Sequence, residues 1–247
     1  LIAVTGTNGK SSIADFYYQI LNLNRKKVAS IGTLGVRANG FNFDLDNTTT
    51  DPIKLGKILK KLRSERIDNV IMEASSHGLK QNRLDGLRFK TGIFTNLSQD
   101  HLDYHKNLKN YLKAKLYLFE NLIEKKGNVI TDKNIIEFNK IKKITSRKNL
   151  NLQAIDDYKS NFKLLSHKYD DEAQILKIKY NSSIKEINLN LIGKVQIKNI
   201  LMAMIAAKKS NIDFKDILNV IPEIKPVEGR LEKIGRVKNK SKVILDY

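Results

Sequence analysis

The sequence predicts an α/β fold in which a mainly parallel β-sheet is flanked by helices, with a small antiparallel hairpin region beside it. Two observations carry this prediction. Short apolar segments at 1–4, 70–72 and 92–97 alternate with segments of helical periodicity, which is typical of strands in a parallel sheet. Residues 174–191 instead alternate apolar and polar side chains around a turn at 181–183, as the two strands of a hairpin do.

Helices are expected after the first strand and at four later places. Apolar side chains recur at helical spacing from Ile13 to Leu21. The second helix starts with Asp51 as its N-cap and Pro52 at its first position, a combination that favours a helix start. The remaining helices are expected at about 108–123, 197–207 and 214–221. No internal repeat is found in the sequence, which favours a single domain.

The 247 residues include 45 Lys and Arg against 26 Asp and Glu, which gives a formal net charge of +19. Because the lysines are scattered, we expect a solvated basic surface and no nucleic-acid partner, with a basic nucleic-acid-binding ATPase as the alternative. The absence of cysteine excludes a disulfide scaffold, a thiolate zinc site and a cysteine nucleophile. There is no apolar run of about 18 residues and no basic-then-apolar leader. We therefore expect a cytoplasmic protein without a membrane partner.

The loop between the first strand and the first helix has the composition of an anion site. It reads Gly6-Thr7-Asn8-Gly9-Lys10-Ser11-Ser12. Backbone N–H groups at a helix N-terminus bind phosphate, Lys10 can reach the terminal phosphates, and the hydroxyl of Ser11 can ligate Mg²⁺. The common phosphate loop has its first glycine where Val4 stands, so this loop is a shortened variant. The alternative is a glycine-containing turn that only caps the helix.

A second polar segment follows the apolar strand at 70–72. Its first residue, Glu73, stands where phosphate-loop enzymes keep an acidic side chain that holds the metal ion directly or through water. A lone glutamate at a strand end is otherwise a solvated terminus. The next residues form a polar run at the carboxyl edge of the predicted sheet, where ligands bind in open α/β folds: Ala74-Ser75-Ser76-His77-Gly78. The histidine-rich segment 101–105 could be a zinc loop, but the ligands that would complete it are missing.

Lys115 lies on the apolar face of the predicted helix at 108–123, together with Leu108, Tyr111 and Leu112. Burying an unpaired, charged amine on such a face costs free energy. Two explanations stay open. Either the stem extends so that the amine reaches water, or the side chain faces a site and carries a function.

Taken together, these segments resemble the Mur ligases, the ATP-dependent ligases that build the peptide of the bacterial cell-wall precursor. The resemblance runs over the whole chain. The segments that carry it are 5–11, 47–49, 72–79, Gln81, Arg83, 94–97, 100–105, Ala114, Lys115 and 226–232. Two of them, 75–79 and 100–105, are similar to the MurE type, which adds the third amino acid of the peptide. The phosphate loop is less specific, because folylpolyglutamate synthases share it.

The resemblance implies that residues 1–247 are a central ATP-binding ligase domain. An N-terminal domain for the uridine nucleotide and a C-terminal domain for the amino acid are then expected outside the chain, whose ends fall inside the apolar runs 1–4 and 243–247. The implied reaction uses ATP and Mg²⁺ to turn a carboxylate of UDP-MurNAc-L-Ala-D-Glu into an acyl phosphate, which a free amino acid then attacks. The implied protein is a monomer that serves peptidoglycan precursor synthesis.

The resemblance also implies roles for individual residues. Catalysis is implied for Lys10, Glu73, His101 and Lys115, the last as a carbamylated lysine. Metal binding is implied for Ser11, Glu73 and His101. ATP binding is implied for Gly6, Thr7, Asn8, Gly9, Lys10, Ser11, Ser12, Asn199, Arg230 and Asp246, while Gln196 replaces the Asn that the family usually has beside the adenine. Contact with the dipeptide end is implied for Thr48, Thr49, Ser75, Gln81 and Arg83.

Two other functions stay open beside this ligase. A folylpolyglutamate-synthase-like ligase would share the phosphate loop, but the segment 75–78 argues against it. An isolated nucleotide-binding module would be inactive without flanking domains, and the intact polar residues of the motifs argue against a degenerate module. The sequence leaves open which amino acid is added, because the residues that select it are expected beyond Tyr247.

Overall fold

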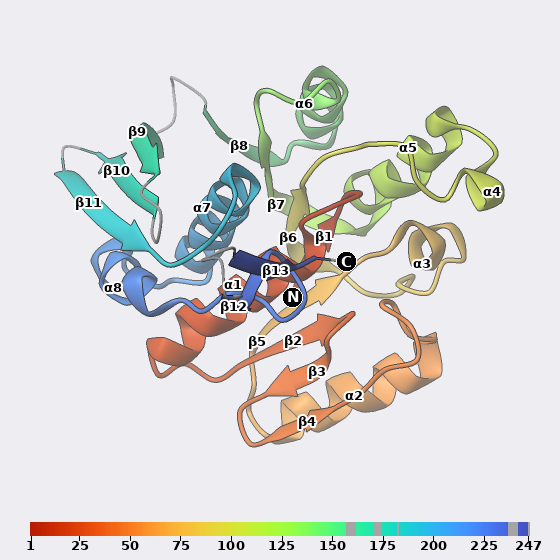
Figure 1. Cartoon of the computed structure of the whole chain (residues 1–247). Helices are drawn as coiled ribbons and strands as arrows, with labels where there is room; N and C mark the ends of the chain where they lie inside the picture. Colours follow the sequence, from red (N-terminus) through yellow and green to blue (C-terminus); the bar gives the residue numbers. More distant parts are fainter. Residues whose placement is uncertain (157–161, 170–173, 182, 237–241, 247) are drawn as a thin grey trace.

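The computed structural model describes residues 1–156, 162–169, 174–181, 183–236 and 242–246 (Figure 1). Its central element is an eight-stranded sheet in the order β4-β3-β2-β5-β1-β6-β7-β8. Neighbouring strands run parallel from β2 to β8, whereas β3 and β4 form an antiparallel edge. The prediction of a mainly parallel sheet is confirmed. The strands are β1 (Ile2–Thr5), β2 (Val28–Gly32), β3 (Gly35–Ala38), β4 (Phe41–Phe43), β5 (Asn69–Glu73), β6 (Phe89–Phe94), β7 (Ile123–Asp132) and β8 (Asn151–Ile155).

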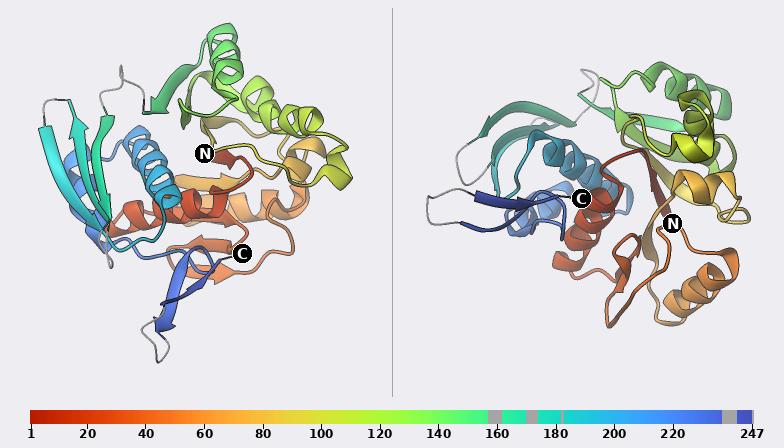
Figure 2. Two further views of the ribbon diagram at one scale, coloured as in Figure 1. Left: turned by 45° about the horizontal axis from the view of Figure 1, so that its top comes forward. Right: turned by 45° about the vertical axis from the view of Figure 1, so that its right-hand side comes forward.

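Helices cover both faces of this sheet (Figures 1 and 2). α1 and α7 pack on one face, and α2, α5 and α6 pack on the other. The side chains of β1 alternate accordingly: Ile2 and Val4 belong to the core under α1, whereas Ala3 belongs to the core under α2. The helices are α1 (Lys10–Leu23), α2 (Pro52–Ser64), α3 (Ser76–Lys80), α4 (Leu102–His105), α5 (Leu108–Tyr117), α6 (Phe138–Lys148), α7 (Lys194–Lys209) and α8 (Phe214–Val220).

The predicted hairpin is confirmed and belongs to a larger antiparallel sheet. β10 (Gln174–Tyr180) pairs with β11 (Ser183–Leu189) and also with a third strand, β9 (Phe162–Tyr169). Of the predicted turn, Ser182 lies outside the described residues. The apolar face of this sheet packs against α7 and α8, where the ring of Tyr180 stacks on that of Phe214 at 4.0 Å. The sheet therefore extends the core on the α1 face.

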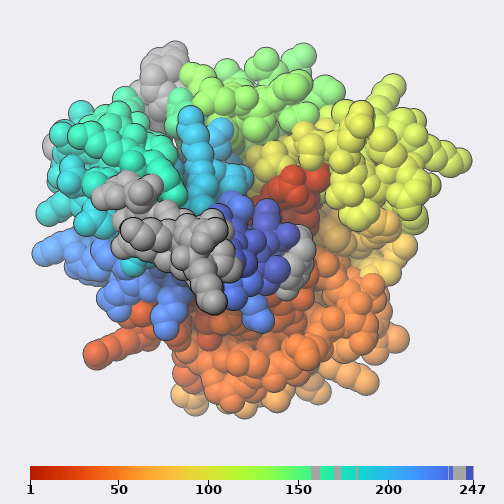
Figure 3. Space-filling model, viewed as in Figure 1, coloured from red at the N-terminus to blue at the C-terminus, as the bar shows by residue number. Residues whose placement is uncertain are grey.

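A two-stranded ribbon ends the described chain, with β12 (Glu232–Arg236) antiparallel to β13 (Lys242–Leu245). Tyr247, in the apolar run predicted at the end of the chain, lies outside the described residues. In the space-filling view the blue C-terminal segment lies in the middle of this face, above the orange segment that contains α2 (Figure 3). The end of the chain therefore lies over the same side of the molecule as the loops described below.

Several parts of the chain differ from the sequence-based expectation. The predicted helix at 108–123 is wrong at its end, because α5 stops at Tyr117, a π-helical turn follows over Leu118–Leu122, and β7 begins at Ile123. Apolar residues continue at helical spacing through the turn because Phe119 packs against Phe94 of β6, so periodicity alone could not mark the change. The sequence analysis also missed other elements, among them the strands β2, β3, β4, β7, β8 and β9 and the helix α6. In α6 most side chains are exposed, which leaves only a weak helical pattern.

Within the described parts of the chain, none of the helices combines the length and the apolar content that a membrane crossing requires.

Candidate active site

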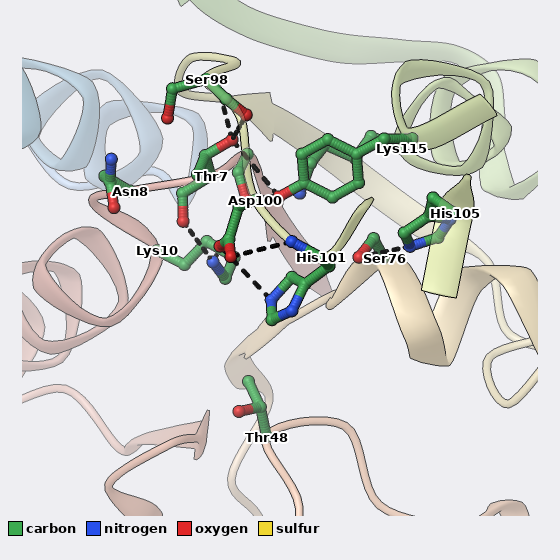
Figure 4. Close-up of polar contacts among 12 residues, drawn as sticks. Thr7, Asn8, Lys10, Thr48, Ser76, Ser98, Asp100, His101, His105 and Lys115 are labelled. Carbon is green, nitrogen blue, oxygen red and sulfur yellow. Dashed lines mark hydrogen bonds and ion pairs between the residues drawn. The ribbon is translucent and has the colours of Figure 1, made fainter. Parts of the chain in front are cut away.

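Loops from three adjacent parallel strands meet at the carboxyl edge of the sheet. β5, β1 and β6 are neighbours in the sheet, so the segments that follow them, 74–75, 6–9 and 95–101, leave it side by side. Figure 4 shows side chains from these loops, among them Thr7, Lys10 and His101, together with Lys115 from α5. This arrangement places the predicted phosphate loop at the centre of the polar cluster.

The loop after β1 requires glycine at both of its ends. Gly6 has φ +146° and Gly9 has φ +85°, in the region that residues with a Cβ rarely adopt. A Cβ on Gly6 would lie 1.8 Å from Oγ1 of Thr95, and a Cβ on Gly9 would lie 2.5 Å from Oδ1 of Asn199. α1 begins directly after Gly9, so the N–H groups of its first turn face the loop. The shortened loop therefore keeps the geometry that favours an anion.

Two lysines reach the start of this loop. Nζ of Lys10 donates to the carbonyl oxygens of Gly6 and Thr7, at 3.1 and 2.7 Å, and Nζ of Lys115 donates to Gly6 O at 2.6 Å. Lys115 is only 1% exposed, and its amine lies 4.2 Å from the centre of the Tyr111 ring. Burial, with a smaller contribution from the charge of Lys10, lowers the pKa of Lys115 to about 6. The side chain thus faces the site, and its amine does not reach water.

Glu73 is buried beside the same loop, at 2% exposure. Its Oε2 accepts hydrogen bonds from Oγ of Ser11 at 3.1 Å and from Oγ1 of Thr33 at 3.3 Å, while Oε1 accepts from the Thr33 N–H at 2.8 Å. Burial raises the pKa of Glu73, and the charge of Lys10 and these hydrogen bonds oppose the shift. The structure therefore brings two predicted metal-binding side chains, Ser11 and Glu73, into contact.

The third predicted metal ligand, His101, borders a cavity of about 360 Å³ together with Ser11 and Glu73. Its Nε2 is 3.3 Å from Oδ2 of Asp100, and its ring packs edge-on against that of His77 at 4.8 Å. Among the described residues, no group of three His, Cys, Asp or Glu side chains is placed to hold a metal ion. The imidazole rings of His101 and His105 instead pack against the ring of His77, and Nε2 of His105 lies 3.0 Å from Oγ of Ser76.

The same cavity is bordered by every residue predicted to contact the dipeptide end: Thr48, Thr49, Ser75, Gln81 and Arg83. Thr49 ties this group together. Its Oγ1 donates to the carbonyl oxygen of Glu73 at 2.8 Å and accepts from the N–H of Ser75 at 2.9 Å, and its own carbonyl accepts from Nη1 of Arg83 at 2.6 Å. Thr49, Ser75 and Arg83 are therefore hydrogen-bonded together beside Glu73.

A second cavity, of about 370 Å³, adjoins the first. It is bordered by most of the predicted ATP-binding residues, namely Thr7, Asn8, Gly9, Lys10, Ser11, Ser12, Asn199, Arg230 and Asp246. Gln196 borders it too, and its side chain donates to the carbonyl of Arg230 at 3.3 Å and accepts from Nδ2 of Asn199 at 2.9 Å. Lys10, Ser11 and Arg230 border both cavities. Gly6, the remaining predicted residue, forms the turn where the loop leaves β1.

Sequence reasoning missed two polar residues of this site. Thr33 follows β2 and holds both oxygens of Glu73, 40 residues away. Tyr111 was assigned only to an apolar helix face, but its hydroxyl lies 3.3 Å from Oγ1 of Thr7, 104 residues away. The position of Tyr111, one helical turn before Lys115, was the one local signal that it shares the lysine's surroundings.

The fold, with its glycine loop between the central strand and α1, defines an α/β domain of the phosphate-loop class. The description "Mur ligase middle domain" fits residues 4–207, and the chain belongs to this family. The chain is 36% identical to a UDP-N-acetylmuramoyl-L-alanyl-D-glutamate–2,6-diaminopimelate ligase of Rickettsia bellii and 35% identical to the same-named protein of Zymomonas mobilis. Both matches cover 100% of the chain but 52% and 51% of the relatives, so it spans about half of their length.

Solved structures show the same fold. A UDP-N-acetylmuramoyl-L-alanyl-D-glutamate–2,6-diaminopimelate ligase superposes with a TM-score of 0.83 at 24% identity, over 96% of this chain and 48% of that chain. A folylpolyglutamate synthase of Mycobacterium tuberculosis, complexed with ADP, superposes with a TM-score of 0.77 at 14% identity, over 99% of this chain and 61% of that chain. At these identities the likeness concerns the fold alone.

Proposed function

We propose that this chain is the central ATP-binding domain of a ligase that adds the third amino acid to UDP-MurNAc-L-Ala-D-Glu, through an acyl phosphate, in cytoplasmic peptidoglycan precursor synthesis. The full-chain similarity to proteins named for this reaction supports the proposal. Their names make 2,6-diaminopimelate the first candidate for the added amino acid. The proposal further includes flanking domains for the uridine nucleotide and the amino acid, and a monomeric protein.

The observation that carries the proposal is the pair of adjoining cavities. One is bordered by the residues expected to bind ATP and the other by those expected to bind the dipeptide end. Forming an acyl phosphate requires a terminal phosphate and a carboxylate to meet, and both are anions. The side chains shared by the two cavities include two cations, Lys10 and Arg230. Cations held between the two binding sites lower the cost of this encounter.

The side chains that we propose for metal binding fit Mg²⁺. Mg²⁺ prefers oxygen ligands and keeps several waters, and the Ser11 hydroxyl and the Glu73 carboxylate both border the cavity within 3.1 Å of each other. When bound, Mg²⁺ supplies positive charge between the two anionic substrates. His101 borders the same cavity and remains the third side chain proposed for the metal site, although its nitrogen is a poorer ligand for this cation than oxygen.

Lys115 is proposed to be carbamylated. A buried amine with a pKa of about 6 is neutral at neutral pH, and the neutral form is the nucleophile that attacks CO₂. The new N–C bond gives a carbamate, and one proton is released to water. The product carries an anionic oxygen beside Lys10, where the unmodified side chain has a neutral amine, and such an oxygen suits a site for Mg²⁺.

Phosphate release by the full-length protein tests the function. With ATP, Mg²⁺ and UDP-MurNAc-L-Ala-D-Glu, one amino acid among 2,6-diaminopimelate, lysine and others should stimulate release, and the tripeptide product should appear by mass spectrometry. A parallel assay with a folate and glutamate distinguishes the folylpolyglutamate-synthase-like alternative. Residues 1–247 alone, assayed beside the full-length protein, test whether the domain works without its flanks. No stimulation by any amino acid would contradict the proposed function.

A further inference from the structure

Thr33 borders the cavity of about 360 Å³ and contacts two other side chains that line it, Glu73 and Thr48. On one side it holds Glu73 twice, through its N–H to Oε1 at 2.8 Å and through its hydroxyl to Oε2 at 3.3 Å. On the other side its hydroxyl lies 3.1 Å from the hydroxyl of Thr48. Thr33 is thus the one described residue whose hydroxyl contacts both of these side chains.

The sheet is built so that this contact can form. β2 and β5 run parallel with Ile31 beside Met72, which brings Gly32 next to Glu73 at the ends of the two strands. A Cβ on Gly32 would lie 2.2 Å from Oε1 of Glu73, so the carboxylate occupies the space of a missing side chain. Glycine at position 32 is required by this close approach. With its carboxylate across the end of β2, Glu73 meets Thr33 and does not turn away to solvent.

We infer that Thr33 is a positioning residue that couples the metal-binding carboxylate to the dipeptide-binding residues, an inference that rests on the proposed function. The direction of the hydrogen bonds explains how. The Thr33 hydroxyl donates its single proton to Oε2 of Glu73. The Thr33 oxygen then accepts a hydrogen bond from the Thr48 hydroxyl. The Thr48 oxygen therefore presents lone pairs, and no proton, to the cavity.

A cation that takes Oε2 of Glu73 competes for the lone pairs that accept from Thr33. Once released, the Thr33 proton can be donated to Thr48, whose own proton is then free to meet an oxygen of the substrate. A substrate carboxylate bound at Thr48 favours this second orientation and so favours the cation. Occupation of each site therefore strengthens the other, by equal factors in the two directions.

Binding measurements on the full-length protein test this coupling without turnover. The probes are Mn²⁺, observed by electron paramagnetic resonance with a non-hydrolysable ATP analogue, and UDP-MurNAc-L-Ala-D-Glu. In the wild type the dipeptide nucleotide should tighten Mn²⁺ binding. Thr33→Val removes the hydroxyl, and with it the bond that competes with the cation for Oε2, but keeps the N–H bond to Oε1, so Mn²⁺ should still bind in the absence of the dipeptide nucleotide. The effect of the dipeptide nucleotide on Mn²⁺ should disappear.

Thr33→Ser is the matched control, because it restores the hydroxyl and should restore the coupling. Thr33→Val combined with Thr48→Val should show no more loss of coupling than either single variant, since one line of hydrogen bonds is broken in each. Thermal unfolding of every variant verifies folding, and Thr33→Ala replaces Thr33→Val if the latter does not fold.

Three results would overturn the inference. If Thr33→Val binds Mn²⁺ and the dipeptide nucleotide with wild-type coupling, Thr33 is only a residue at a strand end, and the proposed function stands. If Thr33→Ser loses as much as Thr33→Val, the hydroxyl is not the group that matters. If the wild type binds no UDP-MurNAc-L-Ala-D-Glu, the inference and the proposed function fall together.

Discussion

The amines of Lys10 and Lys115 donate to the same oxygen, the carbonyl of Gly6, at 3.1 and 2.6 Å. Burial lowers the pKa of both amines, and the charge of Lys10 lowers that of Lys115 further. The two differ in their partners, because the charge of Glu73 raises the pKa of Lys10 again and favours its protonated form. Lys115, with a pKa of about 6, is the neutral amine at neutral pH. The predictions on these two residues follow from this difference.

Replacing Lys10 with Ala should lower ATP turnover about 100-fold or more, because a cation aimed at developing phosphate charge is lost. The fold should persist, since the turns of the loop depend on its glycines. Phosphate release and binding of an ATP analogue measure the effect. Lys26→Ala, a change at an exposed lysine just after α1, is the matched control and should leave both unchanged. Full ATP-dependent activity in Lys10→Ala would show that the loop is not the phosphate site.

Replacing Arg83 with Ala should raise the KM for the dipeptide nucleotide about tenfold or more, through loss of hydrogen bonds to a charged partner. The carbonyl of Thr49 also loses its donor, so the hydrogen-bonded group beside Glu73 loosens. The KM for ATP should change little. Arg88→Ala, at an exposed arginine whose guanidinium bonds only to the neighbouring Leu87 carbonyl among the described contacts, serves as the control. A loss confined to ATP would move Arg83 to another role.

The outline of the site could be predicted because its main parts are local in sequence. The glycines, Lys10 and Ser11 lie within one loop, and Glu73 ends a strand whose apolar run is plain. The roles of Thr33 and Tyr111 could not be predicted in this way. Thr33 meets Glu73, 40 positions away, through the register of β2 and β5, and Tyr111 of α5 meets Thr7, 104 positions away, in the loop after β1. The spacing of apolar residues indicates which face of a helix or strand a side chain occupies. It does not indicate which distant segment packs against that face.

The same limit explains the missed elements at 123–156. β7 begins with charged residues, and in α6 the buried side chains are few, among them Ile141 and Ile144. The sheet continues there because β7 pairs with β6 and β8 pairs with β7, contacts that the local composition does not predict.

Carbamylation should depend on pH in a way set by the lowered pKa of Lys115. The ordinary value for a lysine is 10.5, and burial brings Lys115 to about 6, so the neutral amine predominates above pH 6. Below pH 6 the protonated amine cannot attack CO₂. With ¹³C-bicarbonate, the carbamate carbon signal should therefore rise through pH 6 in the wild type and be absent in Lys115→Arg. A signal that appears only near the pKa of a solvated lysine would contradict this assignment.

Substitution of Lys115 separates the carbamate from an unmodified lysine that pairs with phosphate. If the free cation acts, Lys115→Arg keeps substantial activity, because the charge remains, and removal of CO₂ has no effect. If the carbamate acts, Lys115→Arg fails, because arginine offers no anionic oxygen, and activity should fall about 100-fold as for other groups that stabilise transition-state charge. Circular dichroism controls for folding, since the side chain is buried.

Lys115→Ala provides the decisive comparison, because it leaves a space where the carbamate stood. A small carboxylate such as acetate can enter this space and supply the missing anionic oxygen, so it should partly restore turnover in Lys115→Ala. Acetate should do nothing for Lys10→Ala, in which the missing group is a cation, and that variant is the matched control. Restoration by a small amine in place of acetate would show that Lys115 acts as a cation. An active wild-type preparation without a carbamate signal would reject the modification outright.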